Sequence, residues 1–388
     1  MKYSQMDRQR LLDELIQLLS IDTHFENIPG MTAGIDFYES LLAETGLAIE
    51  RRQVAGRAPF LIARSPDFDK AKPSVLLSGH IETILPADTD RILIQKDRLT
   101  GSGTQDMKGG LMVIIALLRE LAAAGEMKNV TVAVSTEEEQ GPRNRYKHVL
   151  EELARDQDFI MVFESTLDGI DSPAARDRSV VRSRKGLAYV DLTITADGGH
   201  SGVLGRKEQR KSAILKAAEL ITTLEEKVAD YSSGTTVNTG QITAGSGFAV
   251  LAEHADLKID IRYIFDYERE RVLAWIEKQV EAINNEDGFG ASFSVGLDFP
   301  PLQPSQATGA FLDVVASVAR DQDRTLHIED RGGGSEANLF SRANPDAAVL
   351  DGFGVRGDLQ HTSQEYMLTE SLFDAAEFAT AVVRFLLD

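Results

Sequence analysis

Three consecutive glutamates, Glu137, Glu138 and Glu139, come directly after an alternating apolar run at residues 129–135. Adjacent carboxylates repel one another, and at the end of a buried strand they would lie close to the protein core. A glutamate run on its own is most often a solvated surface. Its interpretation here depends on other residues able to bind a cation, because metal ions would offset the repulsion.

Two further apolar runs end in residues of the same kind. His80 and Glu82 follow residues 74–78, and Glu164 follows residues 159–163. In open α/β sheets, ligands bind beyond the carboxyl ends of the strands. Three separate runs that each deliver His or Glu to such an edge are more than composition alone would produce. They predict a metal site at that edge.

Two glycine-rich segments and one polar stretch carry further candidates. Residues 101–110 hold one acid, Asp106, just before an apolar helix pattern, and residues 331–338 form a second glycine-rich loop. Glycine lets a carboxylate be aimed and its neighbours approach a ligand closely. His361 lies in the polar stretch 357–366, before the C-terminal helix. The chain has no cysteine, so any metal must be held by histidine and carboxylate.

The elements that must position these residues alternate between short buried strands and helices. An apolar stripe at helical spacing predicts a helix over residues 5–20. The run 109–124 predicts a helix that is apolar on most sides and ends at Gly125, and such a helix belongs inside a sizeable core. Together with the three apolar strands, this order predicts an α/β layer with a largely parallel sheet.

The pattern changes after about residue 183. The elements expected there are a strand at 186–196, a helix at roughly 208–230, strands at 236–243 and 255–264, a helix near 267–285 and a strand near 291–297. This β-α-β-β-α-β order is that of a split βαβ unit. We therefore predict a small α+β domain, residues 184–302, inserted into a larger α/β domain made of residues 1–183 and 303–388.

Composition narrows the class of protein. The chain has 388 residues and a formal net charge of −20, which argues against nucleic-acid binding because that needs a basic face. The N-terminus lacks the apolar core and cleavage site of a signal peptide, and no apolar run approaches the ~20 residues of a membrane span. We expect a cytoplasmic protein that binds neither nucleic acid nor membrane.

Six motifs occur in order along nearly the whole chain: GHIET, GSGTQDMKGG, TEEEQG, FES, GGGSEAN and QHTSQEY. This series resembles the zinc-dependent family of aminoacylases, glutamate carboxypeptidases, acetylornithine deacetylases and succinyl-diaminopimelate desuccinylases, with a glutamate-carboxypeptidase-like member as the nearest type. The resemblance implies a three-layer α/β/α zinc-hydrolase domain. It also implies that the insert is a ferredoxin-like dimerisation and lid domain.

The resemblance implies a pair of zinc ions. His80 and Glu164 would bind one ion, Glu139 and His361 the other, and Asp106 would bridge the two. The chemistry agrees, because zinc accepts imidazole nitrogen and carboxylate oxygen and keeps an open position for water in catalytic sites. Cobalt or manganese could replace zinc, since sites of this kind select metals weakly.

The resemblance also assigns residues beside the ions. Glu138 resembles the general base that takes a proton from water and passes it to the leaving nitrogen. Glu82 occupies the place of the acid that orients the zinc histidine, and Glu137 is expected to be structural. In the insert, His200 resembles the histidine that reaches the substrate carbonyl across the dimer, and Arg262 resembles the arginine that binds the substrate carboxylate.

At several positions the chain departs from the family pattern. Glu82 and Glu336 replace the commoner aspartate, so each side chain is one methylene longer. Ala249 and Ala252 occupy the places where an asparagine and a proline are often found. The loop that contains Arg331 shifts or loses an arginine seen in glutamate-specific relatives. These departures leave the identity of the substrate open.

The favoured hypothesis is a homodimeric di-zinc amidohydrolase. It would cleave a peptide or N-acyl amide bond next to an amino acid with a free carboxylate, and closure of the insert would complete the site. One alternative is an aminopeptidase or dipeptidase of the same architecture, which recognises a free amine. Another is a non-catalytic, metal-bound dimeric binding protein, suggested by the departures at positions 82, 249 and 336.

Overall fold

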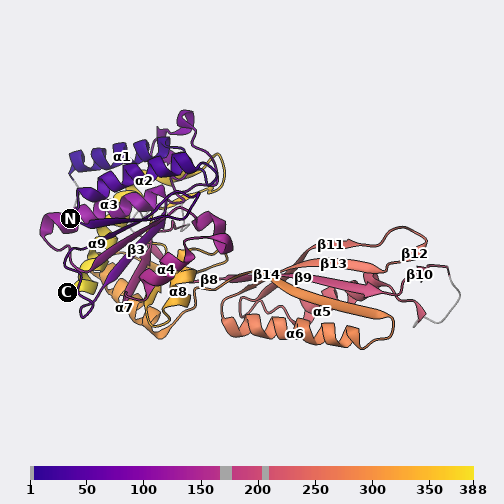
Figure 1. The fold of residues 1–388 in the computed structure, drawn as a ribbon. Coiled ribbons are helices and arrows are strands. Elements are labelled where there is room, and N and C mark those ends of the chain that lie inside the picture. The colour runs from indigo at the N-terminus through magenta and orange to yellow at the C-terminus, as the bar shows by residue number, and fades with distance from the viewer. Residues whose placement is uncertain (1–3, 167–176, 203–208) are drawn as a thin grey trace. The chain divides into compact units, whose positions relative to one another are not determined.

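The computed structural model describes residues 4–166, 177–202 and 209–388. The chain divides into two compact units, drawn as ribbons in Figure 1. Unit 1 comprises Met1–Ser183 and Pro304–Asp388, and unit 2 comprises Arg184–Gln303. Each unit has a hydrophobic core of its own.

The centre of unit 1 is a six-stranded sheet. Its strands lie in the order β1 (Ala48–Arg52), β2 (Phe60–Arg64), β6 (Val130–Ser135), β3 (Val75–His80), β7 (Phe159–Val162) and β16 (Ala348–Leu350). β3 pairs in parallel with β6 and β7, and β7 pairs in parallel with β16. β1 and β2 extend the other edge in antiparallel pairing. The sheet is therefore parallel around β3 and mixed as a whole.

Helices cover both faces of this sheet. They are α1 (Gln5–Ser20), α2 (Ile28–Ala43), α3 (Lys108–Ala124), α4 (Lys147–Ala154), α7 (Gln306–Asp321), α8 (Glu336–Ala343) and α9 (Thr369–Leu387). Val75 and Leu77 of β3 belong to the core under α3 and α9. Leu76 is equally buried but points to the opposite face, where α8 packs on β7 and α4. The α/β fold class predicted from the sequence is confirmed.

Helix α3 is the most enclosed helix of unit 1. Its residues from Lys108 to Leu118 are all buried, as the predominantly apolar run predicts. The helix ends at Gly125, whose φ of 71° is the left-handed conformation that glycine adopts readily at a helix end. Because α3 starts next to Asp106, the core fixes the segment from which this acid projects.

Smaller elements complete unit 1. They are a four-stranded sheet, β17 (Gly357–Asp358), β18 (Tyr366–Leu368), β5 (Arg98–Thr100) and β4 (Ile94–Gln95), a pair of strands, β8 (Arg178–Arg184) and β15 (Leu326–Arg331), and the short helices η1 (Thr89–Arg91) and η2 (Glu138–Arg143). In the four-stranded sheet, Tyr366 pairs with Thr100. This pairing brings the loop before β18 beside the loop after β5.

Unit 2 follows the order β9 (Gly186–Ala196), α5 (Ala213–Lys227), β11 (Thr236–Ala244), β13 (His254–Tyr263), α6 (Asp266–Asn284) and β14 (Phe289–Phe299). The strands form one antiparallel sheet in the order β11-β13-β9-β14. Alternate residues of β9, such as Val190 and Leu192, are buried in the core with the helices. The order and pairing are those of a split βαβ unit. Helix α5 is shorter than the helix expected at roughly 208–230, because it begins at Ala213 and ends at Lys227; position 208 lies outside the described residues.

The two ends of unit 2 are joined to each other. Arg184 N donates to Leu302 O at 3.2 Å, and Leu302 N donates to Arg184 O at 3.0 Å. The chain thus enters and leaves this unit through one short antiparallel bridge. Among the described residues of both units, none of the helices has the length and apolar character needed to span a bilayer.

Candidate metal centre

The candidate site forms where three neighbouring parallel strands end. His80 is the last residue of β3, which lies between β6 and β7 in the sheet. Glu138 and Glu139 begin η2, just after β6, and Glu164 follows β7. Because parallel strands end at the same edge, the topology brings these side chains together.

The first group of possible ligands consists of His80, Asp106 and Glu164, all buried. His80 Nε2 lies 3.1 Å from Asp106 Oδ1 and 3.5 Å from Glu164 Oε1. Imidazole nitrogen and carboxylate oxygens that converge in this way match the ligands of zinc and similar divalent cations.

The second group consists of Asp106, Glu139 and His361. His361 Nε2 lies 3.1 Å from the other oxygen of Asp106, Oδ2, and 3.3 Å from Glu139 Oε1. His361 is in the loop between β17 and β18, and its φ of 61° lies in the left-handed region, which is uncommon for residues other than glycine. The two carboxylate oxygens of Asp106 therefore face one group each.

Glu138 lies beside both groups and belongs to a third set with His80 and Glu139. Its Oε2 is 3.9 Å from His80 Nε2. Burial raises the pKa of Glu138 well above its ordinary value, and the nearby Glu164 and Glu139 carboxylates raise it further, while His80 opposes the shift. A carboxyl with a raised pKa can hold a proton that it has accepted.

Other acids of the region show the same effect. Burial raises the pKa of Glu82 to about 7 and that of Glu336 to about 8. Burial also raises the pKa of Glu164, with the nearby Asp106 carboxylate adding to the shift. A buried region with this many carboxylates is costly when they are all ionised.

The pKa values of the two histidines are also raised, but by the neighbouring carboxylates rather than by burial. Burial alone would lower the pKa of His80, but the carboxylates of Glu82, Asp106 and Glu164 outweigh it and raise the pKa well above its usual value. Hydrogen bonds to Asp106 and Glu139 raise the pKa of His361 to about 10. Two imidazoles cannot balance the surrounding acids. The donor set and its excess negative charge therefore fit divalent cations.

Glu82 contacts one residue of each ligand group. His80 Nδ1 lies 3.1 Å from the backbone oxygen of Glu82 and 3.7 Å from its Oε2. The other carboxylate oxygen, Oε1, accepts a hydrogen bond from Glu139 N at 3.0 Å. Glu82 thus contacts the histidine of the first group and the backbone of a ligand in the second. Glu336, the other lengthened acid, accepts a 2.6 Å hydrogen bond from Ser78 Oγ.

Glu137 has the structural position expected for it. It is buried, its Oε2 accepts a 2.6 Å hydrogen bond from Arg145 N, and its Oε1 lies 3.0 Å from Arg57 Nε. Neither arginine belongs to the candidate groups. The three consecutive glutamates therefore divide between a structural ion pair and the site, which is why the charge cluster is tolerated.

Glu365 is a site residue that the sequence reasoning did not single out. Its carboxylate is buried and accepts hydrogen bonds from the backbone N–H groups of Gly103, Gln105 and Asp106. The only sequence signal is an acid four residues after His361 in a polar stretch. That signal does not distinguish a buried acceptor from a solvated side chain.

His200 and Arg262 belong to unit 2. His200 is exposed in β10 (Gly199–His200), which pairs with β12 (Val250–Leu251), and its Nδ1 accepts a 3.0 Å hydrogen bond from Gly202 N. Arg262 is half-buried on β13, with Nε 2.8 Å from Asp260 Oδ1. Burial lowers the pKa of Lys185, and the positive charge of Arg262 lowers it further. Unit 2 thus places two cations, Lys185 and Arg262, near each other, and Arg262 is paired with Asp260.

The remaining departures from the family pattern have structural places. Ala249 O accepts from Ser201 N at 2.9 Å, so position 249 holds the hairpin beside His200 through its backbone. Ala252 is buried in the core of unit 2. Arg331 forms an ion pair with Glu329 and donates a hydrogen bond to the backbone oxygen of Ser165, the residue after Glu164.

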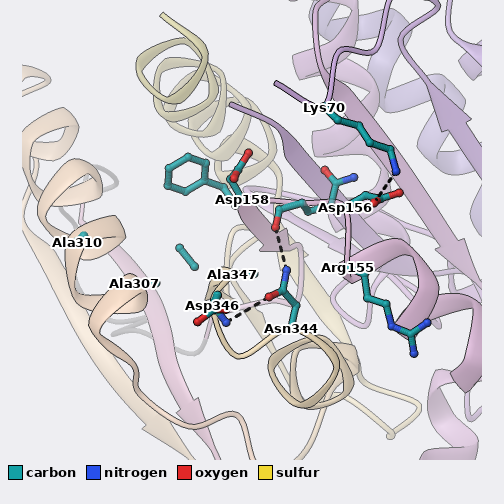
Figure 2. A pocket seen from close by; sticks show the side chains of 12 residues that line it. Lys70, Arg155, Asp156, Asp158, Ala307, Ala310, Asn344, Asp346 and Ala347 are labelled. Atoms are coloured by element: carbon teal, nitrogen blue, oxygen red, sulfur yellow. Dashed lines mark hydrogen bonds and ion pairs between the residues drawn. The ribbon is translucent and has the colours of Figure 1, made fainter. Parts of the chain in front are cut away.

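A cavity of about 540 Å³ with a mixed polar and apolar lining lies at the other end of the strands, near the start of β7 and β16 (Figure 2). It is lined by Lys70, Arg155–Phe159, Ala307, Ala310, Asn344 and Asp346–Ala348. Its charged side chains are partly paired, with Lys70 Nζ 2.7 Å from Asp156 Oδ1. It contains none of the predicted site residues.

The histidines and carboxylates gather at the carboxyl edge of an α/β sheet, where ligands bind in such folds, and their donor atoms are those that hold catalytic metal ions in metal-dependent hydrolases. The sequence model of peptidase family M20/M25/M40 matches residues 76–384, and the chain belongs to this family of metal-dependent hydrolases. The family resemblance drawn from the sequence motifs is confirmed.

Relatives of this chain include enzymes with different names. Carboxypeptidase G2 of Pseudomonas sp. (strain RS-16) is 24% identical over 367 residues, covering 91% of this chain and 84% of that protein. Succinyl-diaminopimelate desuccinylase of Gluconobacter oxydans (strain 621H) is 26% identical over 327 residues, covering 81% of each. These names differ in substrate, so they support the hydrolase class and leave its specificity open.

Solved structures share the fold. The aminopeptidase PepT from Bacillus cereus superposes with a TM-score of 0.81 at 19% identity, covering 98% of this chain and 99% of that one. A dinuclear metal-binding peptidase of the M20 family from Bacillus subtilis gives a TM-score of 0.71 at 16% identity, with 98% of each chain covered.

Proposed function

We propose that this protein is a two-metal amidohydrolase. In this proposal His80, Asp106 and Glu164 hold one divalent cation, and Asp106, Glu139 and His361 hold the other. The observation that carries the proposal is that the two oxygens of Asp106 lie 3.1 Å from His80 Nε2 and 3.1 Å from His361 Nε2, respectively. A carboxylate placed between two imidazoles in this way is suited to bridge two metal ions.

Two bound cations would polarise the scissile carbonyl and make a water molecule more acidic. Glu138, which lies beside both ligand groups, takes the proton of the attacking water and passes it to the leaving nitrogen. Its buried surroundings raise its pKa, which favours the protonated state between these two transfers. Glu82 orients His80 and holds the backbone of Glu139.

The proposed substrate is a peptide or N-acyl amino acid with a free carboxylate beside the scissile amide. The names of two relatives, a carboxypeptidase and a succinyl-diaminopimelate desuccinylase, support this class. Arg262, with Lys185 nearby, is proposed to bind the carboxylate, and His200 is proposed to stabilise the oxyanion. A homodimer and a cytoplasmic location remain part of the proposal.

Zinc is the proposed metal, with cobalt or manganese as substitutes. All the proposed ligand atoms are imidazole nitrogens and carboxylate oxygens. Such a set accepts several divalent cations, and the geometry and supply of the metal decide between them.

The central test is the substitution Glu138→Ala. We expect purified protein to bind two divalent cations per chain and to hydrolyse N-acyl amino acids or dipeptides. Removing the base should lower kcat by about 10²–10⁴-fold while both cations stay bound. Metal content is measured by elemental analysis and hydrolysis by release of the free amino acid.

Glu137→Gln is the matched control. It changes the neighbouring glutamate, whose partners are Arg57 and Arg145, and it should reduce stability while kcat is retained. Full activity in Glu138→Ala would remove Glu138 from the role of base. Paired substrates with free and blocked amino termini separate the proposed activity from that of an aminopeptidase. Stoichiometric metal with no turnover on any amide would instead indicate a binding protein.

A further inference from the structure

The loop that carries His361 is anchored at one end by a buried acid. Residues 361–364 are exposed, whereas Glu365, the next residue, is only 4% exposed. Glu365 N donates to Thr362 O at 3.2 Å, and Thr362 N donates to Leu359 O at 3.2 Å, so the loop turns back on itself before the anchor.

Glu365 binds the loop that carries Asp106 through several hydrogen bonds. Its Oε1 accepts from Gln105 N at 2.8 Å and from Asp106 N at 3.0 Å, and its Oε2 accepts from Gly103 N at 3.0 Å. Its backbone oxygen accepts from Gly101 N at 3.1 Å. A carboxylate is an acceptor with up to four lone-pair directions, so one residue satisfies three backbone donors of a tight loop.

These contacts join the segments that bear two ligands of the same group. Asp106 and His361 face each other within the second group, and Glu365 holds the backbone of both segments. The first group shares Asp106, but its other two ligands have a different support, because His80 ends β3 and Glu164 follows the adjacent strand β7. Loss of Glu365 would therefore disturb the second group more than the first.

We infer that Glu365 is a positioning residue for the second metal ion. It sets the separation between Asp106 and His361 by clamping the loop 101–106 to the loop 359–365. This inference rests on the proposed ligands and does not depend on the proposed substrate. The chain offers two variants that separate the clamp from general packing: Glu365→Ala removes every acceptor of the side chain, and Glu365→Gln keeps one amide oxygen for Gln105 N and Asp106 N.

The test is a titration of metal-free protein with Co²⁺ alone, followed by equilibrium dialysis and by the visible absorption of the bound ion. We expect two ions per chain for the wild-type protein. In Glu365→Ala the first ion should bind within about threefold of the wild-type affinity, and the second should bind about 10–100-fold more weakly. Glu365→Gln should fall between the two, and His361→Ala identifies the spectrum of a protein that has lost the second ion.

Glu14→Ala is the control for loss of a buried, hydrogen-bonded acid. Glu14 accepts from Arg119 at 2.6 Å and 2.9 Å on helix α1, away from the ligand segments in the chain, so its removal should leave both Co²⁺ affinities unchanged. Equal weakening of both ions in Glu365→Ala, or no weakening of either, would overturn the inference. If Glu365→Ala does not fold, an unchanged second affinity in Glu365→Gln would overturn it. A wild-type protein that binds fewer than two ions would refute the ligand assignment itself.

Discussion

Glu82 is the residue at which this chain departs most directly from the family pattern within the site. The longer side chain contacts His80 with one carboxylate oxygen and accepts from Glu139 N with the other. The Glu82 carboxylate thus contacts one ligand of each group. Partners that orient metal ligands in this way commonly affect metal affinity.

The substitution Glu82→Asp tests these contacts. The shorter acid can still approach His80, but it should lose the hydrogen bond to Glu139 N, so metal affinity should fall by about tenfold. Glu82→Gln keeps an acceptor for Glu139 N and should retain more affinity than Glu82→Asp. Competition with a chromogenic chelator measures both. A Glu82→Asp variant that binds metal as tightly as the wild type would show that the reach to Glu139 has no energetic role.

At this scale the structure brings together residues that the sequence singled out by type and position, and their role as metal ligands stays a prediction. His80, Asp106 and Glu164 each stand at the end of an apolar run or beside a glycine-rich turn, and such positions are local in sequence. Glu365 was not predicted because its role depends on which backbone N–H groups remain without partners in a loop distant in sequence. That is a property of the folded chain.

Among the elements, helix α3 packs tightly against neighbouring backbone at its first turn. A Cβ atom added to Gly110 would lie 2.1 Å from the backbone oxygen of Phe163, and one added to Gly109 would lie 2.3 Å from that of Thr104. Glycine is required at both positions because no side chain fits between these backbones. The close approach holds the start of α3 against the segment that leads to Glu164.

The substitution Gly110→Ala should therefore destabilise the protein by about 1–3 kcal/mol, because the helix must shift to admit a methyl group. The same shift should weaken metal binding, since Asp106 precedes α3 and Glu164 follows Phe163. The control is Gly309→Ala in α7, where a Cβ meets no atom within 4 Å. That change should stabilise the helix by about 0.5–1 kcal/mol. Denaturant unfolding measures both, and equal effects of the two substitutions would contradict the packing argument.

The elements that sequence patterns predicted are those with strong apolar periodicity. Helices α1 and α3 and strands β3, β6 and β7 follow directly from apolar runs. Helix α2 does not, because Pro29 and Gly30 lie in its first turn and Gly34 follows, and these residues make a helical pattern hard to recognise. Gly34 packs so closely that a Cβ would lie 2.7 Å from the Thr23 side chain, so tertiary packing selects a residue that local propensity disfavours.

At the scale of the whole molecule, the buried acids and histidines make metal-free stability depend on pH. Glu82 and Glu336 have pKa values of about 7 and about 8 against 4.5 in ordinary surroundings, and His361 has a pKa of about 10 against 6.5. Between about pH 4.5 and pH 10 the folded chain thus binds more protons at these groups than the unfolded chain. Their contribution to stability therefore falls as pH rises through this window.

We expect the melting temperature of chelator-treated protein to fall between pH 5.5 and pH 7. Above this range buried Lys108, whose pKa burial lowers to about 7, contributes in the opposite direction. Saturating Zn²⁺ or Co²⁺ should remove most of this fall, because ligand binding stabilises the folded state and favours deprotonated ligands. Thermal unfolding followed by circular dichroism measures the effect. Glu336→Gln, which stays neutral at every pH, should flatten the metal-free curve. A metal-free melting temperature that is constant or rises over this range would contradict the assignment of these groups as buried and proton-rich.

The bridge between Arg184 and Leu302 affects which changes of sequence length the protein can tolerate. Its two backbone hydrogen bonds hold the two ends of unit 2 next to each other, at the point where unit 2 interrupts the sequence of unit 1. Relative to unit 1, unit 2 is a long loop whose ends are held at this pair of residues. The entropic cost of closing a loop grows only slowly with its length. The sequence beyond the junction can therefore lengthen, shorten or be replaced by another folded segment with adjacent ends at little entropic cost to unit 1.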